Sequence, residues 1–260
     1  IMSNIFLLLA IGIFTGLTTG LTGASGVMVV VPLVTMILKF SIHEAIGTSL
    51  MVDIIAPLAI SLTYYKHGNI DIKSGIWIAI GSIVGAQLGT LLASYVPSVG
   101  LSGAFGIFMI LMAIVIWRKG LHNESIAKAM QKVFKFETKR QRIITALILG
   151  VIVGIMTGII GAGGGGMILL ILIFVLNFPL HVAIGTSALI MSITACSGAI
   201  GYGLRGNIRL ADGLVLGFGA ALSGMVSAKF ANKVNDKVLS KIVAVIFVIL
   251  AIIMTIVKYI

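Results

Sequence analysis

A chain of 260 residues in which 59% of the residues are hydrophobic and only 10% are charged has a mean hydropathy of +1.21. Soluble domains carry about 25% charged residues, so this composition excludes an ordinary soluble protein and indicates one polytopic membrane domain. The net charge of +11 would suggest nucleic-acid binding in a soluble protein. Here the basic residues lie mostly between apolar runs, where they orient a membrane protein, and no nucleic-acid partner is expected.

Ten apolar segments follow one another along the chain. A helix needs roughly 20 residues to cross a bilayer, and we compare the length of each segment with this value. They are 4–22, 26–40, 44–65, 75–95, 98–117, 143–160, 165–178, 183–204, 211–231 and 238–258. The second and the seventh are short and follow Gly-rich stretches, so 16–40 and 154–178 are either re-entrant hairpins or pairs of full crossings. The pattern predicts an all-α polytopic membrane protein.

The first half of the chain returns in the second half at a constant offset of 138 residues. Without a gap, 16–71 aligns with 154–209, with 19 identities over 56 positions. GLTTGLTGASG pairs with GIMTGIIGAGG, HEAIGTS with HVAIGTS, and GNID with GNIR. Duplicated membrane halves with Gly-rich interruptions are typical of secondary transporters. We therefore expect a first transmembrane repeat over 1–117, a basic linker over 118–142 and a second transmembrane repeat over 143–260.

Five crossings in each half is an odd number, so the second repeat is expected to be inverted relative to the first. With the linker in the cytoplasm, fourteen Lys and Arg residues lie inside and four lie outside, namely Lys39, Arg205, Arg209 and Lys258. This distribution follows the positive-inside rule. The prediction is an inverted 5+5 arrangement with both termini outside.

The cytoplasmic linker has an amphipathic helical pattern. Ile126, Met130, Val133 and Phe134 fall on one face, and lysines fall mostly on the other. A short helix lying on the anionic cytoplasmic leaflet is the expected structure, and a solvated loop is the alternative.

Two Gly-rich breaks, 22–26 and 161–166, lie where one apolar run ends and the next begins. Irregular backbone at membrane depth is tolerated only when it is buried in protein or lines a wet cavity. The N–H groups of such breaks and the following helix N-termini would form an anion site. The candidates here are Ser25, Gly26, Gly163, Gly164 and Gly165. Close packing through Gly-x-x-x-Gly is the alternative.

Gly-Thr-Ser recurs at 47–49 and 185–187, where the third and the eighth spans are expected to open. Adjacent hydroxyls at a helix start can cap its N–H groups or donate to an oxyanion. Thr48, Ser49, Thr186 and Ser187 therefore complete the candidate binding set, with simple capping as the alternative. No Lys or Arg is expected at that depth, so neutral donors and helix dipoles would hold the anion.

The order of these motifs in both halves resembles the sulfite exporter TauE/SafE family: a Gly-rich break, a Pro-containing apolar run, His-x-Ala-x-Gly-Thr-Ser and Gly-Asn-Ile-Asp. The resemblance implies a carrier of the bacterial inner (cytoplasmic) membrane for sulfite, sulfoacetate or related organosulfonates, with export driven by the proton gradient. This chain departs from the family pattern at GASG in the first break and at Leu170, which replaces the proline present as Pro32. A carrier of another small anion or sulfur compound on the same fold is the alternative, ahead of a channel or a membrane-embedded enzyme.

Proton coupling would need an ionisable group within the membrane. Of the seven acidic residues, only Asp53 falls well inside an expected span, and a carboxylate there is a functional hypothesis because it is costly in lipid. A buried, hydrogen-bonded Asp without a coupling role is the alternative. Its counterpart is Met191, so any role is confined to one half. His43 and His181 are counterparts of each other and are further coupling candidates, although capping at a span end explains them as well.

Enzymatic chemistry is not expected. The sequence contains no His-Glu-x-x-His, no Gly-x-Ser-x-Gly and no intramembrane carboxylate pair. Its single cysteine, Cys196, can form no intrachain disulfide. We expect no cofactor and no metal. The expected partners are a small anionic substrate, protons and membrane lipid, and the oligomeric state stays open.

Overall fold

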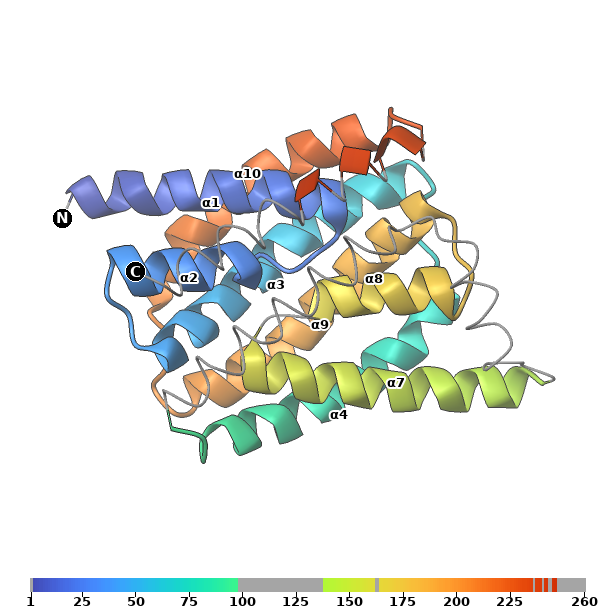
Figure 1. Ribbon diagram of the computed structural model, residues 1–260, viewed down its shortest axis with the longest axis horizontal. Coiled ribbons are helices and arrows are strands. Elements are labelled where there is room, and N and C mark those ends of the chain that lie inside the picture. The colour runs from blue at the N-terminus through green and yellow to red at the C-terminus, as the bar shows by residue number, and fades with distance from the viewer. Residues whose placement is uncertain are drawn as a thin grey trace.

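The computed structural model describes residues 2–97, 138–161, 164–235, 237–239, 241–242 and 245–246. The regular elements of this part are all helices, without a strand (Figure 1), which confirms the all-α prediction. In chain order they are α1 (Met2–Thr22), α2 (Val27–Ile37), α3 (Ile42–Lys66), α4 (Ile72–Ala93), α7 (Lys139–Ile160), α8 (Gly164–Phe174), α9 (Leu180–Gly203) and α10 (Leu210–Ala231). The expected span 98–117, the expected linker helix and most of the expected span 238–258 lie outside the described residues.

Six of these helices, α1, α3, α4, α7, α9 and α10, are long and apolar enough to cross a membrane. Their outer surfaces carry exposed large apolar side chains, among them Phe6, Phe14, Leu62, Phe218 and Val226, as lipid contact requires. The other two, α2 and α8, have 11 residues each, which is about 16 Å of helix. The hydrocarbon core is about 30 Å thick, so neither short helix can cross it alone. The chain is a multi-pass membrane protein.

The sequence repeat reappears in the way the helices pair. Helix α1 packs along α10, and α4 packs along α7, and these two pairs are counterparts under the offset of 138. In both pairs, glycines spaced by four residues face the partner backbone: Gly12, Gly16 and Gly20 face Leu216, Ala220 and Gly224, and Gly81, Gly85 and Gly89 face Leu147, Val151 and Ile155. A Cβ at any of these glycines would overlap a carbonyl oxygen, so small residues permit the close approach. Because both residue numbers rise together, the helices within each pair are parallel.

Helices α3 and α9 cross in the centre of the molecule. Ser192 Oγ of α9 donates a hydrogen bond to the carbonyl oxygen of Ile54 in α3 at 2.9 Å, and these two positions are counterparts. Further along the same crossing, Gly198 faces Leu50, so α3 and α9 are antiparallel. Residue numbers rise together between α3 and α10 and between α4 and α9. Therefore α1, α3 and α10 run in one direction and α4, α7 and α9 in the other (Figure 1), so each long helix runs opposite to its counterpart.

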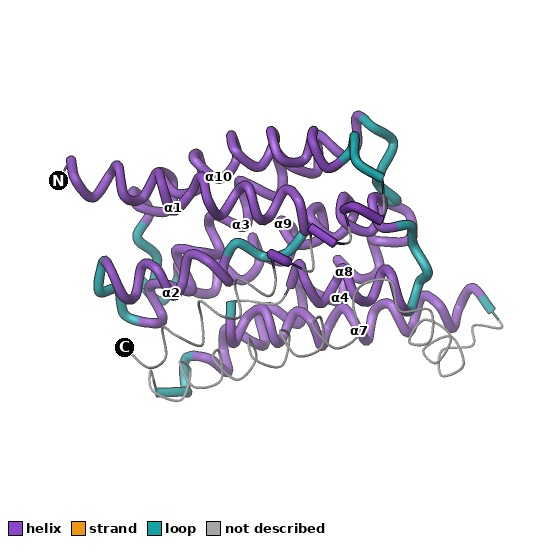
Figure 2. The backbone as a smooth tube through the Cα atoms, turned by 45° about the horizontal axis from the view of Figure 1, so that its top comes forward, coloured by secondary structure: helices purple, strands orange, loops and turns teal. Residues whose placement is uncertain are grey.

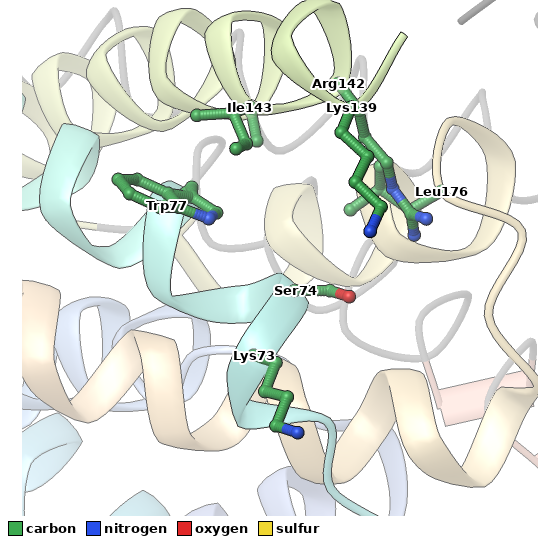
Figure 3. A pocket seen from close by; sticks show the side chains of 8 residues that line it. Lys73, Ser74, Trp77, Lys139, Arg142, Ile143 and Leu176 are labelled. Atoms are coloured by element: carbon green, nitrogen blue, oxygen red, sulfur yellow. The ribbon is translucent and has the colours of Figure 1, made fainter.

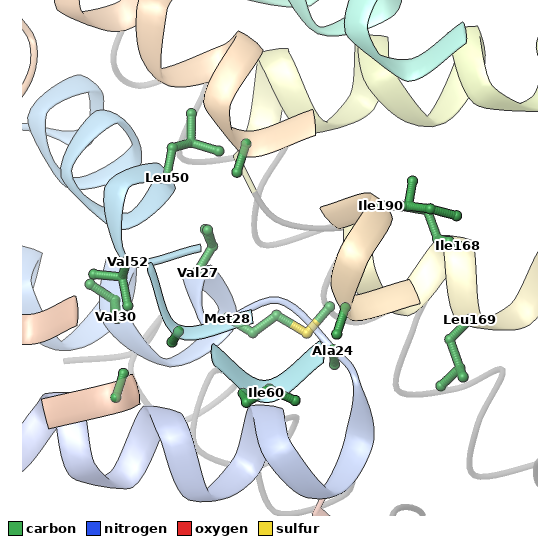
Figure 4. Packing of buried hydrophobic residues seen from close by; sticks show 14 of the residues in the cluster. Ala24, Val27, Met28, Val30, Leu50, Val52, Ile60, Ile168, Leu169 and Ile190 are labelled. Atoms are coloured by element: carbon green, nitrogen blue, oxygen red, sulfur yellow. The ribbon is translucent and has the colours of Figure 1, made fainter. Parts of the chain in front are cut away.

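Most loops gather at the two ends of the long helices, whereas the loop before α2 lies within the bundle (Figure 2). The centre is filled by apolar side chains of α2, α3, α8 and α9, including Val27, Met28, Val30, Leu50, Val52, Ile168, Leu169 and Ile190 (Figure 4). The two short helices therefore start inside a packed core, where any unpaired polar group would be costly.

Candidate functional site

The Gly-Thr-Ser segments lie in the second turns of α3 and α9. Helix α3 begins at Ile42 behind Ser41, whose side chain and that of Glu44 form a capping box, and α9 begins at Leu180 behind Pro179. The prediction that these segments open the two spans is wrong, and so is the alternative that they cap them. Both helices begin five residues before their Gly-Thr-Ser segment, at Ile42 and Leu180, so one full turn that contains His43 or His181 precedes it.

Each Gly-Thr-Ser threonine instead binds the turn that precedes a span of the other half. Thr48 Oγ1 accepts a hydrogen bond from the N–H of Arg209 at 3.0 Å, and Thr186 Oγ1 accepts one from the N–H of Asp71 at 3.0 Å. Arg209 and Asp71 are the N-cap residues of α10 and α4. Each threonine therefore fixes the start of a helix in the opposite repeat.

The glycines of the same segments complete this contact. A Cβ at Gly47 would overlap the carbonyl oxygen of Asn207, and a Cβ at Gly185 would overlap that of Asn69. The duplicated Gly-Thr-Ser and Gly-Asn-Ile motifs are thus partners across the two halves. We call these two symmetric contacts the reciprocal clasp. The serines next to the threonines bond within their own helices: Ser49 to the carbonyl of Ile46 at 2.8 Å and Ser187 to that of Ile184 at 2.9 Å.

Asp53 and the first break form one site. Asp53 is 2% exposed, near the middle of α3. Its Oδ1 accepts a hydrogen bond from the N–H of Gly26 at 2.8 Å, and its Oδ2 accepts one from the hydroxyl of Ser25. Ser25 Oγ also accepts from the N–H of Val27 at 3.2 Å. A carboxylate of the chain itself therefore sits at the N-terminus of α2, where helices generally bind anions.

The second break meets the first at this point. A Cβ at Gly165, in the first turn of α8, would lie 2.6 Å from the carbonyl oxygen of Gly23 and 2.8 Å from the amide nitrogen of Ser25. The Oγ of Ser187 lies 3.5 Å from the same Gly23 oxygen. Ser25, Gly165 and Ser187 are thus brought together. Gly164 lies against Thr157, and Gly163 lies outside the described residues.

Thr19 is a candidate that the sequence did not reveal. It is 1% exposed, and its hydroxyl is the one buried side-chain polar atom in the described part of the chain without a hydrogen-bond partner. A Cβ at Gly26 would lie 3.1 Å from Asp53 Oδ1 and 3.6 Å from Thr19 Oγ1, so the hydroxyl and the carboxylate both lie beside Gly26. The counterpart, Thr157, donates to the carbonyl of Val153 at 2.9 Å. We call Thr19, Ser25, Gly26 and Asp53 the Asp53 cluster.

The two candidate histidines lie at the starts of α3 and α9, away from this cluster. His43 Nε2 is 3.4 Å from the carbonyl oxygen of Ala93, and His181 Nε2 is 3.0 Å from that of Ala231. These contacts are counterparts and join each span to the end of α4 or α10. In the part of the chain searched for metal ligands, no group of three or more His, Cys, Asp or Glu residues could hold an ion.

A basic pocket of about 280 Å³ lies between the starts of α4 and α7 (Figure 3). Its lining includes Lys73 and Trp77 of α4, Lys139 and Arg142 of α7, and Leu176. Neighbouring Ser74 donates its N–H to the carboxylate of Asp71 at 3.1 Å, so the pocket adjoins one half of the reciprocal clasp. Three cationic side chains around one cavity would raise the local concentration of small anions.

Comparison with known proteins gives the family. The model described as "Sulfite exporter TauE/SafE" matches residues 8–254. The chain is 28% identical to "Probable membrane transporter protein YunE" of Bacillus subtilis over 88% of this chain and 89% of that protein. It is also 28% identical to YdhB of the same organism, covering 87% and 90% of the two chains. A probable membrane transporter protein of Methanocaldococcus jannaschii is 31% identical over 75% and 71% of the two chains.

No solved structure matches the chain. The relatives are named as membrane transporters, in agreement with the expectation that this chain is not an enzyme. The family match covers nearly the whole sequence and both copies of the duplicated motifs, and it agrees with the six described helices that are long and apolar enough to cross a membrane. The chain belongs to the sulfite exporter TauE/SafE family.

Proposed function

We propose that this protein is a secondary transporter that exports a small sulfur-containing oxyanion, such as sulfite, sulfoacetate or another organosulfonate, across the cytoplasmic membrane in a proton-coupled cycle. The observation that carries the proposal is the Asp53 cluster. There, the N-terminus of a short helix and a hydroxyl hold an oxyanion, the Asp53 carboxylate, inside the bundle. The family supplies the cargo class. A carrier of a different small anion or sulfur compound on this fold is the second candidate.

The proposed architecture is an inverted 5+5 repeat with both termini outside. It is supported by the opposite directions of counterpart helices and by the positions of basic residues. Lys66, Lys73, Lys139, Arg142 and Lys229 lie at one end of the long helices, and Lys39, Arg205 and Arg209 lie at the other. The positive-inside rule assigns the first end to the cytoplasm. Rocking of one part of such a repeat against another would give alternating access.

The proposed binding site lies where the two breaks meet. Ser25, Gly26, Gly163, Gly164, Gly165 and Ser187 would bind the anion with neutral donors and helix dipoles. The other Gly-Thr-Ser candidates, Thr48, Ser49 and Thr186, are left out of this site, because the two threonines bond to the starts of α10 and α4 on opposite sides of the α3–α9 crossing and Ser49 bonds within α3. The clasp threonines accept the bonds that hold the opposite repeat, so we assign them to the coupling of the halves as the site opens. The basic pocket would collect anions on the cytoplasmic side.

Proton coupling is assigned to Asp53, with His43 and His181 as a second pair of candidates at opposite ends of the bundle. Asp53 is preferred because ionisable residues within membrane helices are costly and generally functional. The histidines contact the ends of the flanking spans, which suits groups that respond when those spans move.

Flux of labelled anions in proteoliposomes tests this function. Sulfite and sulfoacetate should cross, and an imposed pH gradient should change their rate. Asp53→Asn should remove the effect of the gradient while the protein remains folded in the membrane. Protein-free liposomes and a simple carboxylate serve as controls. Equal permeation with and without protein would reject sulfur-oxyanion transport, whereas flux of the carboxylate alone would favour the second candidate.

A further inference from the structure

We infer that the Asp53 carboxylate occupies the anion-binding position on the first break as an internal substitute for the cargo, and that a three-oxygen anion replaces it when Asp53 takes up a proton. This inference rests on the proposed function, because it concerns the same site. Three points go beyond that function: which group competes with the substrate, which shape of anion fits the site, and in which direction the proton travels.

The Asp53 carboxylate and the cargo would compete for the same hydrogen-bond donors. The N–H of Gly26 binds Oδ1 of Asp53, and the hydroxyl of Ser25 binds Oδ2. These are the donors that an oxyanion at the N-terminus of α2 would need. They cannot serve the carboxylate and a second anion at the same time. With Asp53 ionised the site is therefore filled, and the cargo can bind only where this side chain withdraws.

The unpaired hydroxyl of Thr19 indicates the shape of the cargo. Buried polar groups in folded proteins nearly always have a hydrogen-bond partner, so an exception calls for an explanation. A carboxylate has two oxygens, and both are used by the donors of Ser25 and Gly26. Thr19 Oγ1 is a third, unpaired donor, and it lies beside Gly26 of the same site. The SO₃ group of a sulfite or sulfonate offers three oxygens and would engage all three donors, whereas a carboxylate cargo would leave Thr19 unpaired.

The proton is required because, among the described residues, no other charged group lies where it could compensate Asp53. Helices α1, α2, α9 and α10 pack against α3, and α1 and α2 contain no charged residue. On α9, His181 and Tyr202 bind carbonyl oxygens and Cys196 is exposed. On α10, Asp212 and Lys229 lie in the first and last turns, at the two ends of the helix. On α3 itself, His43 lies in the first turn against the carbonyl of Ala93, and Glu44 pairs with Arg209. Tyr64 binds the carbonyl of Gly20, and Tyr65 and Lys66 are exposed at the end of the helix. Two anions in one apolar site would repel strongly, so Asp53 must be neutral when the cargo is bound.

The proton and the anion consequently travel in the same direction, so an inward proton gradient would oppose export, contrary to the expectation from the family resemblance that this gradient drives it. For a dianion such as sulfite, the pair carries one net negative charge, and an inside-negative membrane potential drives that charge outward. The second half has no equivalent acidic residue, because Met191 stands at the position of Asp53 and its sulfur lies against Gly165. One proton site is therefore expected for each chain.

Calorimetry on the purified full-length protein tests the inference. Ethanesulfonate is the probe because, unlike sulfite, it does not change its own protonation between about pH 5 and about pH 8. Titrations in buffers with different ionisation heats count the protons. The wild type should take up about one proton per anion in the range where Asp53 is ionised, and the dissociation constant should rise about tenfold per pH unit there. Asp53→Asn should bind with no proton uptake and no pH dependence. Asp212→Asn, an acid outside the cluster, should behave as the wild type.

Thr19→Val tests the third donor. This hydroxyl has no partner in the structure, so its removal leaves the fold intact, but ethanesulfonate affinity should fall roughly ten- to a hundredfold. In the Asp53→Asn background, ethanesulfonate should bind more tightly than propionate, and adding Thr19→Val should abolish that preference. A purely structural role for Thr19 would change neither affinity.

Any of three results would overturn the inference: wild-type binding without proton uptake, unchanged pH dependence in Asp53→Asn, or no ethanesulfonate binding at any pH. If Asp53→Asn does not fold, the wild-type proton count and Thr19→Val decide alone. A protein that passes these tests but carries no sulfite in vesicles would contradict only the transport function. One that transports sulfite and fails them would contradict only the inference.

Discussion

Replacement of Thr48 by valine is expected to loosen a helix that belongs to the other repeat. Valine keeps the shape of threonine but removes the oxygen that accepts the N–H of Arg209 at 3.0 Å. Thr48 is fully buried in α3, and the released N–H lies at the start of α10. Thr186→Val is the counterpart and releases the N–H of Asp71 at the start of α4.

The size of the effect follows from the bond that is lost. Both bonds are only partly buried, so the loss of one should cost about 1 kcal/mol, the net value of an ordinary hydrogen bond. At about 2–4 °C per kcal/mol for a chain of this size, the unfolding midpoint should fall by about 2–4 °C. Both threonines lie six residues from the crossing of α3 and α9, about 9 Å along each helix on opposite sides. Their effects should therefore add in the double variant to within about 0.5 kcal/mol.

Thermal unfolding in detergent and hydrogen exchange measure this directly. In Thr48→Val, amide exchange should accelerate at 209–212, and in Thr186→Val at 71–74. Thr48→Ser keeps the acceptor and should retain slow exchange at 209–212. Thr63→Val is a matched control, because Thr63 bonds the carbonyl of Ala59 within α3 and its loss releases no N–H. Unchanged exchange at 209–212 in Thr48→Val would refute the reciprocal clasp.

Three further predictions concern packing, topology and anion capture. Gly85→Ala should lower the free energy of unfolding by about 1–3 kcal/mol, because the new Cβ would overlap the backbone of α7. Gly203→Ala is the control, because its Cβ meets only a side-chain methyl at 3.5 Å, and it should leave the unfolding midpoint unchanged in the same melting assay. Single cysteines replacing Lys66 and Arg205, in a background without the native cysteine, should react with impermeant reagents from opposite sides of the membrane; labelling from one side would exclude the inversion. Arg142→Gln should raise the KM for anion flux and weaken its salt dependence while leaving kcat unchanged, and an unchanged KM would remove the basic pocket from the transport path.

Much of the helical architecture could be predicted from hydropathy and the repeat. The bounds of α4, α7 and α10 lie within a few residues of the expected spans, because long apolar runs leave few alternatives to a helix. The starts of α3 and α9 also lie within a few residues of the expected spans. Gly-Thr-Ser was nevertheless taken for a helix start, because Gly, Thr and Ser are typical of caps, although one helical turn precedes each copy.

The contacts of the site were harder to predict, for two physical reasons. Asp53 and Ser25 were both candidates, but their hydrogen bond joins positions 28 residues apart, and the repeat gives no second example because Met191 replaces Asp53. The clasp joins Thr48 to a turn 161 residues away in the other copy, which alignment of the copies cannot show. Thr19 is an ordinary helical threonine in sequence, and only the three-dimensional arrangement shows that its hydroxyl is buried and unpaired.

Counterflow of sulfite tests the central claim most directly, because it requires a carrier with a binding site. Proteoliposomes loaded with unlabelled sulfite are diluted into a trace of labelled sulfite, and uptake of the label is followed with time. The expected result is a transient accumulation of label above its equilibrium level, weakened in Ser25→Ala and absent without protein. Simple equilibration without an overshoot, or uptake equal to that of empty vesicles, would contradict transport of sulfite by alternating access at the meeting point of the two breaks.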